Sequence, residues 1–276
     1  MAKYPLLFGK LTEQGLLGPR DVLEPDEATL EDLALVHSDD YLGRLAADSL
    51  SVTEQRRLGV PWSPRLWRRS RLAVQGTLLA ARAALEDGLA ANLAGGTHHA
   101  FADHGEGFCV LNDVAIAIRV LQRERAIERA LVIDLDVHQG NGTASIFAGD
   151  GTVFTFSMHG ERNYPLEKIS STLDVGLADG LDDEAYLGVL QENLECIAAR
   201  CTADIAFYLA GVDVVRGDRY GRLALTEDGL RRRERLVLDW ARNARRLPLT
   251  ITIAGGYAVT PERTASLHAI VFEEAV

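Results

Sequence analysis

The chain has 276 residues, of which 47% are hydrophobic and 25% are charged. This balance is typical of a globular protein with a large core, and it excludes a disordered chain, a fibre and a coiled coil. The formal net charge of −11 disfavours direct nucleic-acid binding and at most mildly favours cationic substrates. We expect no membrane span and no signal peptide, and therefore a cytoplasmic protein. The three cysteines fit no zinc-finger or CxxC spacing and predict reduced thiols.

The first third of the chain is predicted to be mostly helical. A short amphipathic stretch covers 8–17, and a capping box begins at Thr29 and ends at Asp32. A longer helix is predicted over 67–85, where an apolar stripe lies opposite arginines.

Beyond this helix, short apolar runs alternate with helical patterns. The predicted strands are 90–93, 130–135, 153–156, 205–210 and 249–254, and the predicted helices are 112–122, 184–199, 227–243 and 261–272. Continuously apolar strands separated by helices are typical of a parallel sheet covered on both faces. The sequence therefore predicts a single α/β domain over 1–276, with three α/β/α layers and ligands beyond the carboxyl ends of the strands.

Polar side chains follow nearly every predicted strand. Asp136 and His138 are spaced i and i+2, so on a strand they would point to the same side. Asp213, after another strand, would complete a site of three ligands with an open position, as a catalytic metal needs. Two carboxylates and one imidazole suit Zn²⁺ and would also take Fe²⁺.

Several long motifs contain these residues. They read GGTHHAFADHGEGFCVLND, VIDLDVHQGNG, AGVDVVRGDRYGRLALTEDG and GGY. In order and spacing they resemble the histone deacetylases of the arginase–deacetylase fold. The DLDVHQGNG form, the RNYP segment and GDRYG are most similar to class IV histone deacetylases, and the resemblance covers nearly the whole chain.

The resemblance implies a role for each matching position. Asp136, His138 and Asp213 would bind zinc, His98 and His99 would be the paired active-site histidines, and Tyr257 would polarise the scissile carbonyl. The substrate tunnel would be lined by Gly107, Phe108, Tyr164, Tyr220, Gly255 and Gly256. A structural K⁺ or Na⁺ would be bound by Asp134 and Ser157 with backbone carbonyls of Asp136, His138 and Met158.

The family pattern also separates the two histidines by their partners. It pairs His98 with Asp134 and places His99 opposite Asn141. Since a neutral amide stabilises imidazolium less than a carboxylate does, His99 is expected to be the more neutral histidine and the base. The implied reaction is hydrolysis of an acyl-lysine amide, with either an acetyl or a long fatty-acyl group. For class IV we expect a myristoyl-lysine peptide to be hydrolysed faster than its acetyl counterpart.

Other interpretations remain open. A binuclear ureohydrolase would need bridging carboxylates where Gly140 and Val215 stand. A non-catalytic acyl-binding module would be expected to have lost a ligand, His99 or Tyr257, and none is lost. A deacetylase of small acylated amines, such as acetylpolyamines, would have the same motifs.

The remaining candidate residues are given no active role. We interpret His37, His104 and His268 as incidental, and Asp103 and Glu106 as a solvated rim. Cys109 is expected to pack beneath the tunnel rather than act as a nucleophile.

Overall fold

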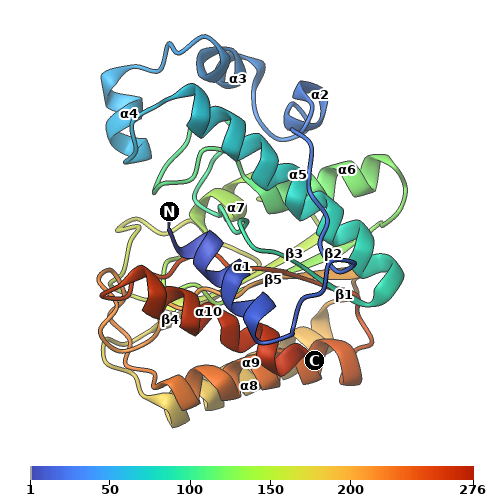
Figure 1. Ribbon diagram of the computed structural model, residues 1–276, viewed down its shortest axis with the longest axis vertical. Helices are drawn as coiled ribbons and strands as arrows, with labels where there is room; N and C mark the ends of the chain where they lie inside the picture. The colour runs from blue at the N-terminus through green and yellow to red at the C-terminus, as the bar shows by residue number, and fades with distance from the viewer. Residues whose placement is uncertain (1) are drawn as a thin grey trace.

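The computed structural model describes residues 2–276, in which six parallel strands form one sheet (Figure 1). In spatial order these are β1 (Leu89–Asn92), β6 (Leu249–Thr252), β5 (Ile205–Leu209), β2 (Ala130–Asp134), β3 (Val153–Gly160) and β4 (Leu173–Leu177). The predicted α/β/α architecture with a parallel sheet is confirmed. The strand order reverses next to β2, and in such sheets the crevice at this point is the usual ligand site.

Helices cover both faces of the sheet (Figure 1). One layer contains α5 (Pro64–Asp87) and α6 (Asp113–Arg123), and the other contains α8 (Asp183–Arg200), α9 (Glu227–Leu238) and α10 (Pro261–Ala275). The amino-terminal helix α1 (Lys3–Glu13) packs on α10. The short helices are α2 (Leu30–Leu33), α3 (Asp39–Ala46), α4 (Val52–Leu58), α7 (Asn141–Ile146) and the π-helix η1 (Asp239–Ala244).

The inner strands β2, β3, β5 and β6 are buried almost throughout, which explains their largely apolar sequences. Leu131 and Ile133 of β2 pack into the core beneath α8, α9 and α10. Ala130 and Val132, which alternate with them, pack into the core beneath α5 and α6. None of the helices within residues 2–276 has the length and apolar character needed to cross a bilayer.

The structure corrects several predicted boundaries. β4 has no predicted counterpart because it is an edge strand of alternating exposure, without the apolar run that marks the buried strands. β3 extends to Gly160, so Ser157 and Met158 lie within a strand and not after one. Helix α1 begins at Lys3, earlier than predicted, and the helix predicted over 227–243 becomes η1 after Leu238. Thr29 does cap α2, by accepting a hydrogen bond from the Asp32 backbone N–H.

Candidate active site

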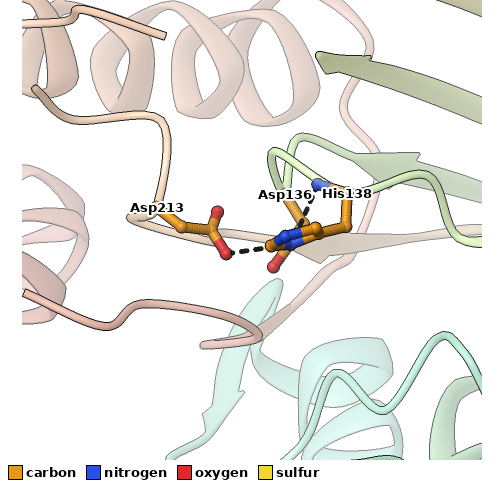
Figure 2. A group of neighbouring side chains, drawn as sticks. All are labelled: Asp136, His138 and Asp213. Carbon is orange, nitrogen blue, oxygen red and sulfur yellow. Dashed lines mark hydrogen bonds and ion pairs between the residues drawn. The ribbon is translucent and has the colours of Figure 1, made fainter. Parts of the chain in front are cut away.

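Asp136, His138 and Asp213 come together beyond the carboxyl ends of β2 and β5 (Figure 2). One ligand atom from each lies within 4.8 Å of the other two. The expectation that Asp136 and His138 share a strand face is wrong, because β2 ends at Asp134 and both residues follow it in a bend. The loop geometry, and not strand alternation, turns them toward Asp213.

The chemistry of this group fits a divalent metal. Asp213 Oδ2 is buried without a hydrogen bond, and its nearest partner is His138 Nδ1 at 3.4 Å. His138 is largely buried, which opposes its protonation, yet hydrogen bonds and charge from Asp136 and Asp213 raise its pKa to about 10. The two carboxylates therefore stabilise positive charge here, as they would on a metal cation. Gly255 is required beside them, because a Cβ there would overlap Asp136 and Asp213 carboxylate oxygens.

The paired histidines sit on the loop that follows β1, and a buried carboxylate holds that loop. Asp113, the first residue of α6, accepts hydrogen bonds from the backbone N–H groups of Gly96 and Thr97 at 3.0 and 2.8 Å. It also accepts one from the Thr77 hydroxyl at 2.5 Å. This anchoring fixes where the next two residues, His98 and His99, enter the site.

His98 is bound to a carboxylate. Its Nδ1–H donates to Asp134 Oδ2 at 2.6 Å, and its Nε2 lies 3.9 Å from Asp136 Oδ1. Burial opposes protonation of His98, but the charges of Asp134 and Asp136 raise its pKa to about 9. The expected pairing with Asp134 is present, and the geometry favours a protonated His98.

His99 is bound to an amide instead. Its Nδ1–H donates to Asn141 Oδ1 at 2.7 Å, which leaves Nε2 free to accept a proton. Burial, followed by the charges of His98 and His138, holds the pKa of His99 well below its usual value. The carboxylate partner of His98 favours its protonated form, and the amide partner of His99 does so less. These are the two pairings that the family resemblance implies.

Glu106 controls the orientation of Asn141, a role that sequence reasoning missed. Its Oε1 accepts a hydrogen bond from Asn141 Nδ2 at 2.8 Å, so the amide oxygen must face His99. Burial raises the pKa of Glu106, but hydrogen bonds from His104, Tyr164 and Asn141 outweigh it and lower the pKa to about 2. The prediction that Glu106 belongs to a solvated rim is wrong, since its side chain is only 16% exposed.

Tyr257 is held on the opposite side of the site by Asp218. The Tyr257 backbone N–H donates to Asp218 Oδ2 at 2.6 Å, and the Tyr220 N–H donates to Asp218 Oδ1 at 2.9 Å. Burial raises the pKa of Tyr257, so its hydroxyl remains a hydrogen-bond donor. Asp218 is a second positioning residue without a role in the sequence prediction, although it stands inside the quoted GDRYG segment.

A cavity of about 740 Å³ is lined by Asp136, His138, His98, His99 and Tyr257, together with other residues. Its exposed end is aromatic: Phe108, Tyr164 and Tyr220 are 44%, 41% and 50% exposed. Gly107 passes so close to His99 that a Cβ would lie 2.6 Å from the imidazole ring. The predicted tunnel residues Gly107, Phe108, Tyr164, Tyr220, Gly255 and Gly256 all line this cavity.

The residues expected to bind a monovalent cation lie together behind His98. Asp134 and Ser157 are register partners on β2 and β3. Asp134 Oδ1 accepts the Asp136 N–H at 3.1 Å, and the Ser157 hydroxyl contacts His159 Nδ1 at 2.9 Å. Cation binding at this position stays a prediction.

Cys109 and His37 fit the expected assignments, which gave them no active role. Burial raises the pKa of the Cys109 thiol, which makes it a poor nucleophile at neutral pH. His37 Nε2 accepts the Asn112 N–H at 3.0 Å, so His37 has a structural contact. His104 is the exception, since it contacts Glu106 at the edge of the site.

Comparison with known proteins identifies the family. The histone deacetylase domain matches residues 1–273. An uncharacterized protein of Picosynechococcus sp. is 50% identical over 94% of this chain and 86% of its own length, and histone deacetylase 2 of Arabidopsis thaliana is 32% identical over 92% and 67%.

Solved structures agree on the fold. The crystal structure of a histone deacetylase homologue from Aquifex aeolicus has a TM-score of 0.83 at 24% identity, over 98% of this chain and 77% of that one. A histone deacetylase homologue complexed with SAHA has the same TM-score, 0.83, at 25% identity, over 98% and 76%. The chain belongs to the histone deacetylase family.

Proposed function

We propose that this chain is a zinc-dependent amidohydrolase that removes acyl groups, acetyl or longer, from lysine side chains, and that residues 1–276 form one catalytic domain. The observation that supports this most directly is the convergence of Asp136, His138 and Asp213 beside a cavity. The wall of that cavity includes Asp136 and His138 together with His99 and Tyr257. Family membership supports the same chemistry.

Asp136, His138 and Asp213 would bind the metal ion. Two carboxylates and an imidazole suit Zn²⁺, with Fe²⁺ as the alternative ion. When bound, the metal would supply Lewis acidity toward the scissile carbonyl and lower the pKa of water. Gly140 and Val215 stand where a binuclear enzyme would need bridging carboxylates, which supports a mononuclear site. Among residues 2–276, no second group of potential metal ligands is found.

His99 would move the proton. Its Nδ1–H is committed to Asn141, so Nε2 takes a proton from the attacking water and later gives it to the departing lysine amine. The water oxygen bonds to the carbonyl carbon, the C–N bond breaks, and a carboxylate and an amine leave. Glu106 maintains the tautomer of His99 that this requires.

Tyr257 and His98 would stabilise charge. The Tyr257 hydroxyl donates to the oxygen that becomes negative, a contact stronger in the transition state than in the substrate. His98, paired with Asp134, adds positive charge to the same region. A K⁺ or Na⁺ beside Asp134 and Ser157 would stabilise the fold of the loop between them and the metal ligands.

Lysine in a peptide or protein is favoured over a polyamine as the amine component. The cavity is lined by Lys3, Arg57, Arg69 and Arg219, while Asp136 is the only carboxylate on its wall within the described residues. A polycationic substrate would be repelled by this lining. The mild preference for cationic substrates predicted from the net charge is therefore not supported locally. The three cysteines occur as thiols, which is compatible with our proposal of a cytoplasmic location.

The deciding experiment is hydrolysis of an Nε-acetyl-lysine peptide by protein loaded with Zn²⁺. We expect activity that a chelator removes and added Zn²⁺ restores. Acetylspermidine at matched concentration should be hydrolysed more slowly. Saturable binding of the peptide without turnover at any metal loading would instead favour a non-catalytic acyl-binding module.

A further inference from the structure

The inner end of the cavity contains two cations from two different helices. Lys3 of α1 and Arg69 of α5 line the same cavity as Asp136 and His138. Both side chains are partly buried, in contrast to the exposed aromatic residues at the other end. We call Lys3, Tyr4 and Arg69, with the small residues Ala94, Gly95, Gly96 and Thr97 that line the cavity with them, the inner chamber.

Lys3 keeps one donor free. Its Nζ donates to the Ala254 carbonyl at 2.9 Å and lies 3.4 Å from His268 Nε2. An ammonium has three donors, so a third N–H is available. Burial lowers the pKa of Lys3 to about 8, which still leaves the amine mostly protonated at neutral pH.

Arg69 also lacks a countercharge. Its Nη2 donates to the Tyr4 hydroxyl at 2.9 Å. Its neighbours Arg68 and Arg71 both pair with Glu27, at 3.1 and 2.9 Å. No carboxylate of residues 2–276 lies within ion-pair distance of Arg69 or Lys3, and the carboxylates that act on the charge of Lys3 at longer range are chiefly Asp213 and Asp136, the predicted metal ligands.

The chamber lies close to the carboxylate of the predicted metal ligand Asp136. The Ala254 carbonyl that binds Lys3 belongs to the same peptide unit as the Gly255 N–H, which donates to Asp136 Oδ2 at 2.7 Å. With standard backbone dimensions, this chain of contacts places Lys3 Nζ within roughly 8 Å of Asp136 Oδ2. If a lysine amide enters past the exposed Phe108 and Tyr164, its acyl group would point away from that end of the cavity, toward Lys3 and Arg69.

We propose that the inner chamber binds a carboxylate at the far end of a short dicarboxylic acyl group, so that the enzyme prefers succinyl- or glutaryl-lysine to uncharged acyl-lysines. This rests on the proposed function. The far carboxylate of these groups lies roughly 5–6 Å from the scissile carbonyl, within the span to Lys3. There it would accept charge-assisted hydrogen bonds from the Lys3 ammonium and the Arg69 guanidinium. Hydrolysis consumes one water and releases the dicarboxylate and the lysine amine.

A methyl-terminated chain fits the chamber less well. Its carbons would remove water from Lys3 and Arg69 without replacing the lost hydrogen bonds, which is unfavourable. The proposal therefore reverses the acyl-length expectation drawn from the sequence, in which a myristoyl peptide is preferred.

The test compares one peptide carrying acetyl-, butyryl-, succinyl-, glutaryl- or myristoyl-lysine. Butyryl and succinyl have the same number of carbons, so their ratio isolates the carboxylate. We expect kcat/KM for succinyl or glutaryl to exceed that for butyryl by about tenfold or more, the effect of a hydrogen bond to a charged group. Equal or faster hydrolysis of the butyryl or myristoyl peptide overturns the proposal.

Variants assign the preference to the two cations. Lys3→Met and Arg69→Met should each reduce the succinyl-to-butyryl ratio by about tenfold, and Arg69→Lys should retain part of it. Arg68→Met, on the same helix but paired with Glu27, is the matched control and should leave the ratio unchanged. Circular dichroism and thermal melting check that each variant is folded. An unchanged ratio in folded Lys3→Met and Arg69→Met assigns the preference elsewhere and overturns the inference.

Calorimetry separates this inference from the proposed function. If no peptide is hydrolysed, the proposed function fails, and binding of free succinate and butyrate then decides the inference. Succinate binding that is lost in Lys3→Met and Arg69→Met supports the inner chamber. Equal binding of the two acids, or no binding of succinate, overturns it.

Discussion

Glu106 Oε1 accepts a hydrogen bond of 2.8 Å from Asn141 Nδ2, and through this contact a residue near the cavity mouth determines which ring nitrogen of His99 is basic. An ionised carboxylate can only accept, so it orients the Asn141 amide in one way. The amide oxygen then requires a protonated Nδ1 on His99. Two hydrogen bonds thus link Glu106 to the predicted proton acceptor.

Glu106→Ala should lower kcat/KM by about 10–100-fold, since Asn141 can then rotate and His99 loses its fixed tautomer. Glu106→Gln should retain more activity, because its amide oxygen can still accept from Asn141. Steady-state kinetics and metal analysis of both variants check this. Asp204→Ala, at an exposed carboxylate on the loop before β5, is the control. Equal losses in Glu106→Ala and Glu106→Gln would contradict the orienting role.

Asn141→Asp should move the acidic limb of the kcat/KM profile to higher pH by about one unit or more. The pKa of His99 now lies well below its usual value because of burial and nearby positive charge. A carboxylate at Nδ1 would stabilise imidazolium, and a base must be neutral to accept a proton. Activity should therefore be lost at low pH and recover as the pH rises through the new pKa. A profile that does not move, with Glu106 also changed to Gln so that two carboxylates do not share a proton, would exclude His99 as the base.

Asp213→Ala should abolish both metal binding and hydrolysis, because it removes one of three ligands. The wild-type protein should contain one catalytic transition metal per chain by elemental analysis, with monovalent ions excluded. Asp204→Ala, at an exposed carboxylate on the loop before β5, is the control and should retain the metal. Two catalytic metals per chain would reject the mononuclear site.

Tyr257→Phe should keep its metal and lose about 10²–10³-fold in kcat, the usual cost of removing one oxyanion donor. The backbone N–H that binds Asp218 is unaffected by this change. Kinetics together with metal content separate the outcomes. Turnover at the wild-type rate would remove Tyr257 from the mechanism, and loss of metal would assign it a structural role.

Arg233→Met should destabilise the fold by about 3–5 kcal/mol, because it leaves the Glu234 carboxylate buried without a cation. Arg233 is fully buried, pairs with Glu234 at 2.5 Å, and donates to the carbonyls of Leu135 and Gly211 at 3.2 and 2.7 Å. These carbonyls lie in the loops after β2 and β5, shortly before the ligands Asp136 and Asp213, so metal affinity should fall as well. Chemical denaturation and metal titration measure both effects. Tyr208→Phe, which removes one hydrogen bond to Glu234, should cost less.

The sequence alone predicts the parallel sheet, because short, largely apolar runs alternate with longer helical patterns, as expected for strands covered on both faces. It also singles out Asp136, His138 and Asp213, since metal ligands must be specific residue types after specific strands. β4 is not predicted from the sequence, because this half-exposed edge strand has no continuous run of apolar residues.

The tertiary structure determines contacts between residues that are far apart in the sequence, which the spacing of motifs cannot predict. Glu106 and Asn141 are 35 residues apart, Asp218 and Tyr257 are 39 apart, and Lys3 and Ala254 are 251 apart, yet each pair shares a hydrogen bond. Such contacts depend on how loops from different strands and helices pack, and no local periodicity encodes them. The sequence thus determines the sheet and the chemistry of the ligands, whereas the positioning roles of Glu106 and Asp218 and the charge of the inner chamber follow only from the packed structure.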